Sequence, residues 1–210
     1  MKNYINVKNQ IDYNKLRKPA EIIKKGGIVI FPTETVYGIG ANGLDIKAIE
    51  KLYKLKKRPH NKPISLLVSD MDMVNLVAKD ITDLEYKLME KIFPGPLTIV
   101  LNKREVVPDI LTAGQNTIGI RMPSEKIARE LIEYVGSPIA TSSANISGES
   151  SKTNIKTLIQ DFNQEVDYFI DGGESEIGVA STVVQLIDGV PVILREGSIS
   201  RDEIMRVIKK

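Results

Sequence analysis

The chain has 210 residues, with 29 Lys and Arg against 27 Asp and Glu, and 42% of its residues are hydrophobic. This length suits a single domain over residues 1–210, and the near balance of charge argues against a protein that binds extended nucleic acid. The absence of cysteine excludes disulfides and thiol nucleophiles, and a single histidine, His60, excludes a cluster of His ligands. No apolar run reaches the ~20 residues that span a bilayer, and no signal peptide begins the chain, so we expect a cytoplasmic protein without a membrane span.

Apolar residues recur at spacings that alternate between helix and strand along the chain. The dipeptide Asp188-Gly189, placed between two apolar runs, is a strong hairpin signal and makes the sheet mixed. The expected elements, in chain order, are a helix at 12–25, a strand at 28–31, a helix at 45–57, a strand at 64–68, a helix at 82–92, strands at 97–101 and 117–122, a helix at 124–134, strands at 138–141, 168–170, 182–187 and 190–194, and a last helix through Ile204, Val207 and Ile208. We therefore expect one α/β domain of the α+β type, a twisted mixed sheet flanked by helices.

The stretch Gly38-Ile39-Gly40-Ala41-Asn42-Gly43 fits G-x-G-x-x-G, the pattern of a dinucleotide-binding turn. In that turn the first glycine comes immediately after a strand, whereas Gly38 comes seven residues after Phe31, the last residue of the expected strand. We interpret the glycines instead as a tight turn with positive φ and close packing.

Polar and basic groups gather after two of the expected elements. Residues 32–37 present hydroxyls, a carboxylate and a phenol after the first buried strand, where open α/β sheets often bind small molecules. Residues 51–62 read KLYKLKKRPHNK and contain six basic side chains and no acid. A solvated helix face is the ordinary interpretation of such a run. Pro59 and Pro63 stiffen the backbone here, however, and a rigid cluster of cations suits a polyphosphate. His60 is expected to be an exposed loop residue.

A second polar turn, Thr141-Ser142-Ser143-Ala144-Asn145, follows the strand at 138–141. It either caps the local backbone or binds a ligand by hydrogen bonds. A serine nucleophile is disfavoured because G-x-S-x-G is absent. Arg121 interrupts an apolar run and Arg195 ends the last strand, and arginines placed in this way are usually structural unless several converge.

Five motifs in this order resemble the YrdC-like family: FPTETVYGIG, Lys56-x-Arg58, Ser143-x-Asn145, STVV at 181–184 and LREG at 194–197. The resemblance covers about Gly26 to Gly197 and looks like the single-domain form of the family. It implies a twisted sheet around a concave, positively charged cavity. It also implies the best-known reaction of the family, in which L-threonine, bicarbonate and ATP give threonylcarbamoyl-AMP and pyrophosphate. Other proteins then complete the modification of a tRNA adenosine, so tRNA and tRNA-modification proteins are possible partners.

The resemblance also assigns roles to individual residues of this sequence. Catalysis would involve Lys56, Arg58, Ser143 and Asn145. ATP would be bound by Arg58, Lys62, Thr117, Ser143, Ser151 and Arg195. Threonine would be bound by Thr35, Arg121, Thr141 and Ser181, with Arg121 paired to its carboxylate. Mg²⁺ is expected to accompany the ATP, with no metal site built from protein ligands alone. The carbamate of threonine is itself a nucleophile, so positioning and charge stabilisation would suffice for catalysis.

One position departs from the family pattern, and two other functions remain open. Many relatives have a histidine late in the strand after the basic loop, where this chain has Leu67, and this bears on the threonine pocket. The first alternative is the carbamoyl-phosphate-using domain of hydrogenase maturation factors, which occurs in longer chains with zinc-finger cysteines. The second is a module that binds double-stranded RNA or tRNA. A net charge of only +2 and an aromatic content of 5% argue against this second function.

Overall fold

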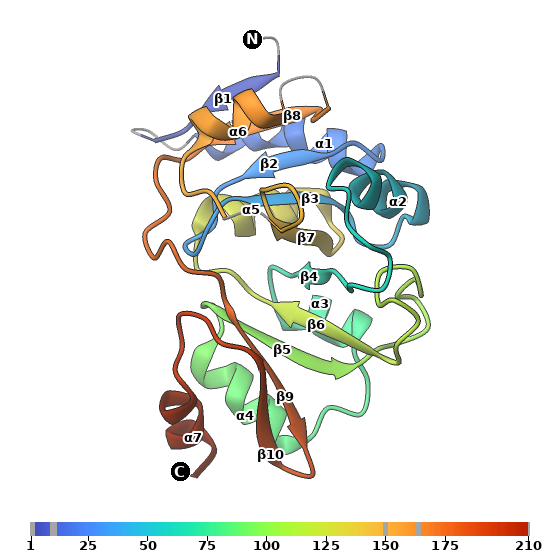
Figure 1. Ribbon diagram of the computed structural model, residues 1–210, viewed down its shortest axis with the longest axis vertical. Helices are drawn as coiled ribbons and strands as arrows, with labels where there is room; N and C mark the ends of the chain where they lie inside the picture. Colours follow the sequence, from blue (N-terminus) through green and yellow to red (C-terminus); the bar gives the residue numbers. More distant parts are fainter. Residues whose placement is uncertain (1–2, 9–11, 149–150, 163–164, 210) are drawn as a thin grey trace.

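The computed structural model describes residues 3–8, 12–148, 151–162 and 165–209. Within these residues ten strands form one mixed sheet, and β1 and α7, the first and last elements, lie at opposite ends of the molecule (Figure 1). The strands, in spatial order, are β1 (Tyr4–Asn6), β8 (Tyr168–Asp171), β2 (Val29–Phe31), β3 (Gly38–Asn42), β7 (Ile139–Ser143), β4 (Ser65–Leu67), β6 (Thr117–Arg121), β5 (Leu97–Asn102), β9 (Thr182–Ile187) and β10 (Val190–Arg195). Pairs β1/β8, β2/β8, β4/β6 and β5/β9 are parallel and the other neighbours are antiparallel, which confirms the expected mixed sheet.

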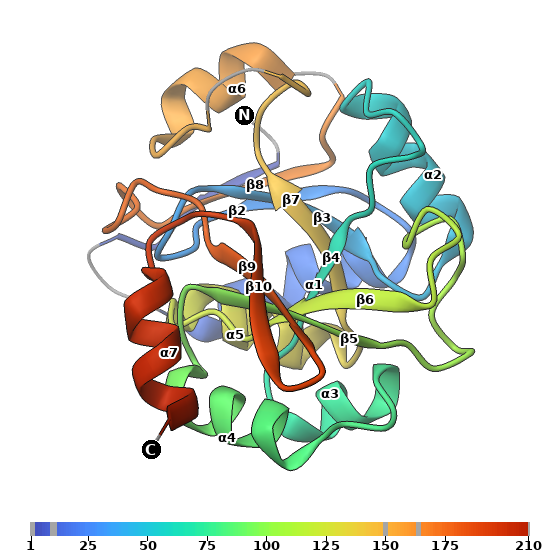
Figure 2. The ribbon, with the colours of Figure 1, turned by 60° about the horizontal axis from the view of Figure 1, so that its bottom comes forward.

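Helices cover the sheet because each carries an apolar stripe that needs a partner surface. They are a short 3₁₀ helix (Tyr13–Leu16), α1 (Arg17–Lys24), α2 (Ile46–Leu55), α3 (Met71–Val77), α4 (Asp83–Ile92), α5 (Lys126–Val135), α6 (Ile155–Phe162) and α7 (Arg201–Lys209). Helices α1 and α5 pack on each other and share an apolar cluster with β2, β7 and β8. Helices α4 and α7 contact each other at the end of the molecule that holds β5, β9 and β10 (Figure 2). Among the described residues, no helix is long and apolar enough to cross a membrane.

Local sequence signals explain where several elements begin and end. Asp45 caps α2, where its carboxylate accepts hydrogen bonds from the amides of Lys47 and Ala48. Thr82 and Glu85 form a reciprocal capping box at the start of α4. The β9–β10 hairpin turns at Asp188-Gly189 with φ angles of 52° and 77°, as this dipeptide predicts.

The interpretation of the glycine stretch as a tight turn with positive φ was wrong. Gly38 and Gly40 lie in β3, a buried strand between β2 and β7, and neither has a positive φ. The expectation of close packing was correct, because a Cβ on Gly40 would lie 2.6 Å from the Ile139 Cγ2 atom and 2.9 Å from the Phe31 ring. Three other elements were not expected from the sequence at all: β1, α3 and α6.

Candidate functional site

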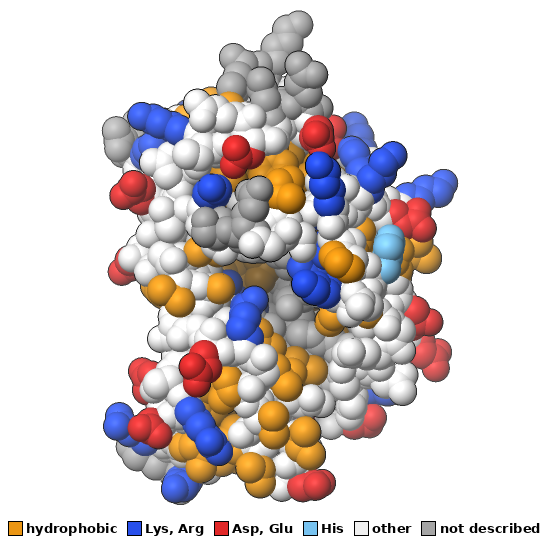
Figure 3. Space-filling model, viewed as in Figure 1, with side chains coloured by type: hydrophobic (Ala, Val, Ile, Leu, Met, Phe, Trp, Pro, Cys, Tyr) orange, Lys and Arg blue, Asp and Glu red, His pale blue; other side chains and the backbone are white. Residues whose placement is uncertain are grey.

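A cavity of about 480 Å³ opens on one side of the twisted sheet. Figure 3 shows this hollow in the middle of the surface, with Lys and Arg side chains beside it. Its wall is built from β4, β5, β6, β7, β9 and β10, together with the segments that follow β2 and α2. Elements from both ends of the chain therefore contribute to one site. The arrangement explains why polar residues that are distant in the sequence each follow or interrupt an apolar strand.

Nine of the twelve residues singled out in the sequence line this cavity. They are Thr35, Arg58, Lys62, Thr117, Arg121, Thr141, Ser143, Ser181 and Arg195. Lys56, Asn145 and Ser151 are not among the lining residues. Ser151 is exposed, next to Lys152, whose carbonyl oxygen accepts a hydrogen bond from the Tyr37 amide.

Arg121 stands at the end of β6, where the sequence places a cation inside an apolar run. Its Nη2 atom lies 2.8 Å from the Glu34 Oε2 atom, and both side chains are buried. Burial lowers the pKa of Arg121, and the Glu34 carboxylate opposes that shift. The expected pairing of Arg121 with a substrate carboxylate therefore involves a guanidinium that already has an anionic neighbour. The sequence analysis included Glu34 in the polar stretch 32–37 but assigned it no individual role.

Several hydroxyl groups of the cavity wall form hydrogen bonds with one another. The Thr33 and Thr35 hydroxyls are 2.9 Å apart, and the Thr33 hydroxyl also donates to the Val36 carbonyl at 2.6 Å. The hydroxyls of Thr98 and Ser181 are 2.8 Å apart. Thr98 lines the cavity but was not expected from the sequence, although its polar side chain in the apolar run LTIVL is a signal that could have identified it.

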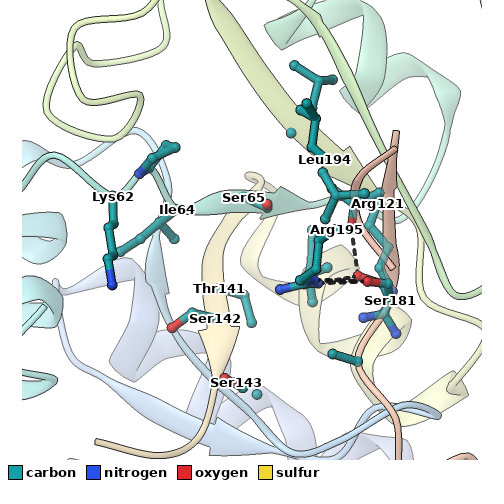
Figure 4. A pocket seen from close by; sticks show the side chains of 18 of the residues that line it. Lys62, Ile64, Ser65, Arg121, Thr141, Ser142, Ser143, Ser181, Leu194 and Arg195 are labelled. Atoms are coloured by element: carbon teal, nitrogen blue, oxygen red, sulfur yellow. Dashed lines mark hydrogen bonds between the residues drawn. The ribbon is translucent and has the colours of Figure 1, made fainter. Parts of the chain in front are cut away.

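Arg195, at the end of β10, crosses to the start of β9. Its Nη2 atom donates to the Ser181 carbonyl at 2.8 Å and to the Ser181 hydroxyl at 3.1 Å. Figure 4 shows these bonds, with Arg121 beside Arg195, Lys62 on the far side of the hollow, and Thr141, Ser142 and Ser143 between them. An anion bound in the hollow would therefore have Lys62 on one side and the two arginines on the other.

The basic loop after α2 is ordered by its own arginine. Arg58 donates from Nε to the Lys62 carbonyl at 3.0 Å and from Nη2 to the Pro63 carbonyl at 2.7 Å, so its side chain closes the loop that carries Lys62. Lys62 is exposed and lines the cavity. His60 is also exposed, as expected of a loop residue, and its ring stacks on the Tyr53 ring with 4.8 Å between the ring centroids.

The basic side chains of the cavity influence one another. Burial lowers the pKa of Arg195, and repulsion by Arg121 and then by Arg58 lowers it further. Among the described residues, no Asp or Glu lines the cavity. An anionic ligand would relieve this repulsion, which is a physical reason to expect one. The net positive charge of the cavity stays a prediction, because the Glu34 carboxylate, 2.8 Å from Arg121, offsets part of the positive charge.

Lys56 occupies a different place from the one expected of a phosphate-binding lysine. Its side chain is 1% exposed, and its ammonium donates to the backbone carbonyls of Ser143 and Asn145, the latter at 2.8 Å. Burial, followed by repulsion from Arg58, lowers the pKa of Lys56 to about 7. Asn145 is also buried; its side-chain oxygen accepts from the Ser143 hydroxyl, and its amide donates to the Ile146 carbonyl. Lys56 thus supports the turn after β7, and Ser143 is the member of this group that reaches the cavity.

Leu67 also lines the cavity, at the end of β4, and its side chain is almost fully buried in the apolar cluster that includes Phe31 and Ile139. The cavity wall is therefore apolar at this position, where the family pattern suggested a histidine.

Comparison with known proteins gives several matches. A Pyrococcus abyssi protein named threonylcarbamoyl-AMP synthase is 44% identical over 204 residues, which cover 97% of this chain and 60% of that protein. A Methanocaldococcus jannaschii protein is 39% identical over 210 residues, which cover 98% of this chain and 99% of its own length. The solved structure of P. abyssi Sua5 complexed with L-threonine matches with a TM-score of 0.95 at 43% identity, and covers 98% of this chain and 60% of that chain.

The chain thus spans about 60% of the length of the P. abyssi relative. Residues 21–197 match the profile of a family described as "Telomere recombination". This match takes in β2 to β10 and every side chain that lines the cavity. The sequence and the fold therefore agree that the chain belongs to the Sua5/YciO/YrdC family.

Proposed function

We propose that this chain is a threonylcarbamoyl-AMP synthase, an enzyme that converts L-threonine, bicarbonate and ATP into L-threonylcarbamoyl-AMP, pyrophosphate and water. The observation that supports the proposal most is that nine residues expected to hold ATP and threonine line one cavity. The name of the P. abyssi relative and the threonine complex of its Sua5 structure support the same activity.

The proposed reaction requires no nucleophilic side chain. The amine nitrogen of threonine forms a bond to the carbon of bicarbonate, and loss of water leaves a carbamate. A carbamate oxygen then attacks the α-phosphorus of ATP, and the bond from this phosphorus to the bridging oxygen breaks as pyrophosphate leaves with the electron pair. The protein holds the two reactants in line and stabilises charge on the phosphoryl group.

The residues of the cavity suit these two tasks. Arg58, Lys62 and Arg195 would contact phosphate oxygens, since cations stabilise the charge that develops on a transferring group. Arg121 would bind the threonine carboxylate. The hydroxyls of Thr35, Thr141 and Ser181 would bind the rest of the amino acid, and Ser143 and Thr117 the nucleotide.

Mg²⁺ would enter with ATP as part of the substrate. The described residues contain no group of three or more His, Asp or Glu side chains that could hold a metal ion, and the cavity wall offers hydroxyls, amides and cations. Magnesium commonly takes phosphate oxygens and water as ligands, so the residues of the cavity fit a metal carried by the nucleotide. When bound, it would neutralise charge on the phosphates.

We place the product in the threonylcarbamoyl modification of tRNA, with tRNA-modification proteins as partners and the cytoplasm as the compartment. Direct binding of tRNA by this chain would be a further property. If it occurs, the affinity for tRNA should fall steeply as the salt concentration rises, because each phosphate contact releases counterions.

Pyrophosphate release measured with purified protein tests the proposal. ATP and Mg²⁺ alone should release little, and rapid release should require both bicarbonate and L-threonine. L-Serine, which lacks one methyl group, should react more slowly by a factor that corresponds to about 1–3 kcal/mol. L-Valine lacks the hydroxyl and should be poorer than serine, because a protein hydroxyl loses its partner.

Two results would contradict the proposal. Release that ignores threonine but needs carbamoyl phosphate would assign the carbamoyl-transfer chemistry of hydrogenase maturation. An absence of ATP turnover together with salt-sensitive RNA binding would assign a binding module.

A further inference from the structure

Glu34 and Arg121 connect two parts of the sheet that are far apart in the strand order. Glu34 follows β2, Arg121 ends β6, and strands β3, β7 and β4 lie between them. The contact of 2.8 Å between the two side chains therefore runs across the side of the sheet that carries the cavity. Arg121 lines the cavity and Glu34 does not, so the carboxylate of Glu34 meets the site through its contact with Arg121.

The backbone around Glu34 is fixed on both sides. Its carbonyl oxygen accepts from the Ile177 amide at 2.8 Å, and the Thr35 carbonyl accepts from the Gly178 amide at 2.8 Å. The segment between β8 and β9 that supplies these amides is itself anchored by Tyr37, whose hydroxyl donates to the Gly173 carbonyl at 2.7 Å. These bonds fix the backbone that carries Glu34. Its two carboxylate oxygens have no hydrogen-bond partner among the described residues, and the Oε2 atom lies 2.8 Å from the Arg121 Nη2 atom as an ion pair.

A buried guanidinium needs such a partner. Glu34 is 4% exposed and Arg121 is 7% exposed, and an isolated charge at that depth would be strongly disfavoured. Arg121 also repels Arg195, and a neighbouring carboxylate offsets that repulsion. The Arg121 Nε atom has no hydrogen-bond partner within the described part of the chain, so the guanidinium keeps donor capacity beyond its contact with Glu34.

We infer that Glu34 is a positioning residue that orients the guanidinium of Arg121 for the carboxylate of the amino acid substrate. The inference rests on the proposed function and adds to it a residue that determines which chemical group is recognised. An arginine held by a fixed carboxylate loses little freedom when it binds a second carboxylate, so it favours ligands that carry one.

The test compares L-threonine with L-threoninol, which keeps the amine and the side chain but lacks the carboxylate. Binding of both to the full chain is measured by calorimetry in the presence of Mg²⁺ and a non-hydrolysable ATP analogue, for the wild type, Glu34→Gln and the matched control Glu176→Gln. Glu176 is exposed on the segment between β8 and β9. Glu34→Gln removes the charge of the ion pair and should weaken threonine binding by about 10- to 100-fold, and leave threoninol and nucleotide affinity within about two-fold.

Each outcome decides the matter. An equal loss for threonine and threoninol, or a similar loss for the nucleotide, would show that Glu34 only supports the fold and would overturn the inference. Unchanged threonine affinity in Glu34→Gln would also overturn it. If Glu34→Gln does not fold, Glu34→Asp keeps the charge but shortens its reach and should give the same selective loss at smaller size. Failure of the proposed function looks different, because the wild type itself would then show no threonine-dependent release of pyrophosphate.

Discussion

The ammonium of Lys56 donates a hydrogen bond to the backbone carbonyl of Asn145 over 2.8 Å, across 89 positions of sequence. A second bond goes to the Ser143 carbonyl. The basic motif after α2 and the polar turn after β7 are therefore joined inside the protein, and Lys56 stabilises the position of Ser143 in the cavity wall.

Replacing Lys56 with Met should lower stability and activity together. Two buried carbonyls would lose their donor, which costs about 1–3 kcal/mol each. Part of this loss is offset because methionine carries no charge that must be desolvated on folding. Urea unfolding should show a free energy of unfolding that is lower by roughly 2 kcal/mol, and pyrophosphate release should fall at least ~10-fold. Lys54→Met, the same change at an exposed position of α2, should alter neither. Loss of activity with unchanged stability would instead place the Lys56 ammonium on the phosphates.

The lowered pKa of Lys56 predicts a pH dependence of stability. In the folded protein this pKa is about 7, below the ordinary lysine value of 10.5, so between these values the unfolded state binds more protons. Stability must then rise with pH across this window, by at most about 1.4 kcal/mol per unit from this one group. The difference in unfolding free energy between wild type and Lys56→Met, measured from pH 7 to 10, should therefore increase. A flat difference would mean that the ammonium keeps its ordinary pKa, and a falling difference would mean that folding raises it.

Arg58→Ala should reduce pyrophosphate release strongly without unfolding the protein. The guanidinium lines the cavity and also closes the loop that carries Lys62. Its loss therefore removes the cation of Arg58 and makes the position of Lys62 less fixed. We expect a rate lower by ~30- to 1000-fold, which corresponds to roughly 2–4 kcal/mol of transition-state stabilisation. His60→Ala, an exposed change in the same loop, is the control and should stay within a few-fold. A comparable loss in His60→Ala would reveal an acid–base role, and near-normal turnover of folded Arg58→Ala would remove Arg58 from the chemistry.

Gly43→Ala tests whether the glycine stretch serves packing or ligand binding. A Cβ at this position would lie 2.4 Å from the Leu66 Cδ2 atom and 2.7 Å from the Pro138 carbonyl oxygen, so the strand ends must shift. We expect the free energy of unfolding to fall by about 1–3 kcal/mol, with unchanged ATP affinity in the folded fraction. A variant that is as stable as the wild type but binds nucleotide poorly would assign these glycines to the site.

The sequence by itself determined most helices and strands, because their signals are local. Asp45 marks the start of α2, and Asp188-Gly189 predicts the β9–β10 hairpin from two adjacent residues. The motifs and their order were enough to indicate the family and to name nine residues that line one cavity. Strand β3 was missed because Gly38 and Gly40 have low strand propensity, and only packing against Phe31 and Ile139 makes glycine the residue that fits there.

The roles of the individual charges were decided by the tertiary structure. Lys56 and Arg58 are two residues apart and look equivalent in sequence, yet one is 1% exposed beneath the turn after β7 and the other lines the cavity. Glu34 and Arg121 meet only because the sheet places the ends of β2 and β6 on the same side of the molecule. Burial and long-range contacts decide which partner a charged group has, and the partner influences its pKa and its function. Those contacts join residues far apart in the chain, so spacing along the sequence cannot reveal them.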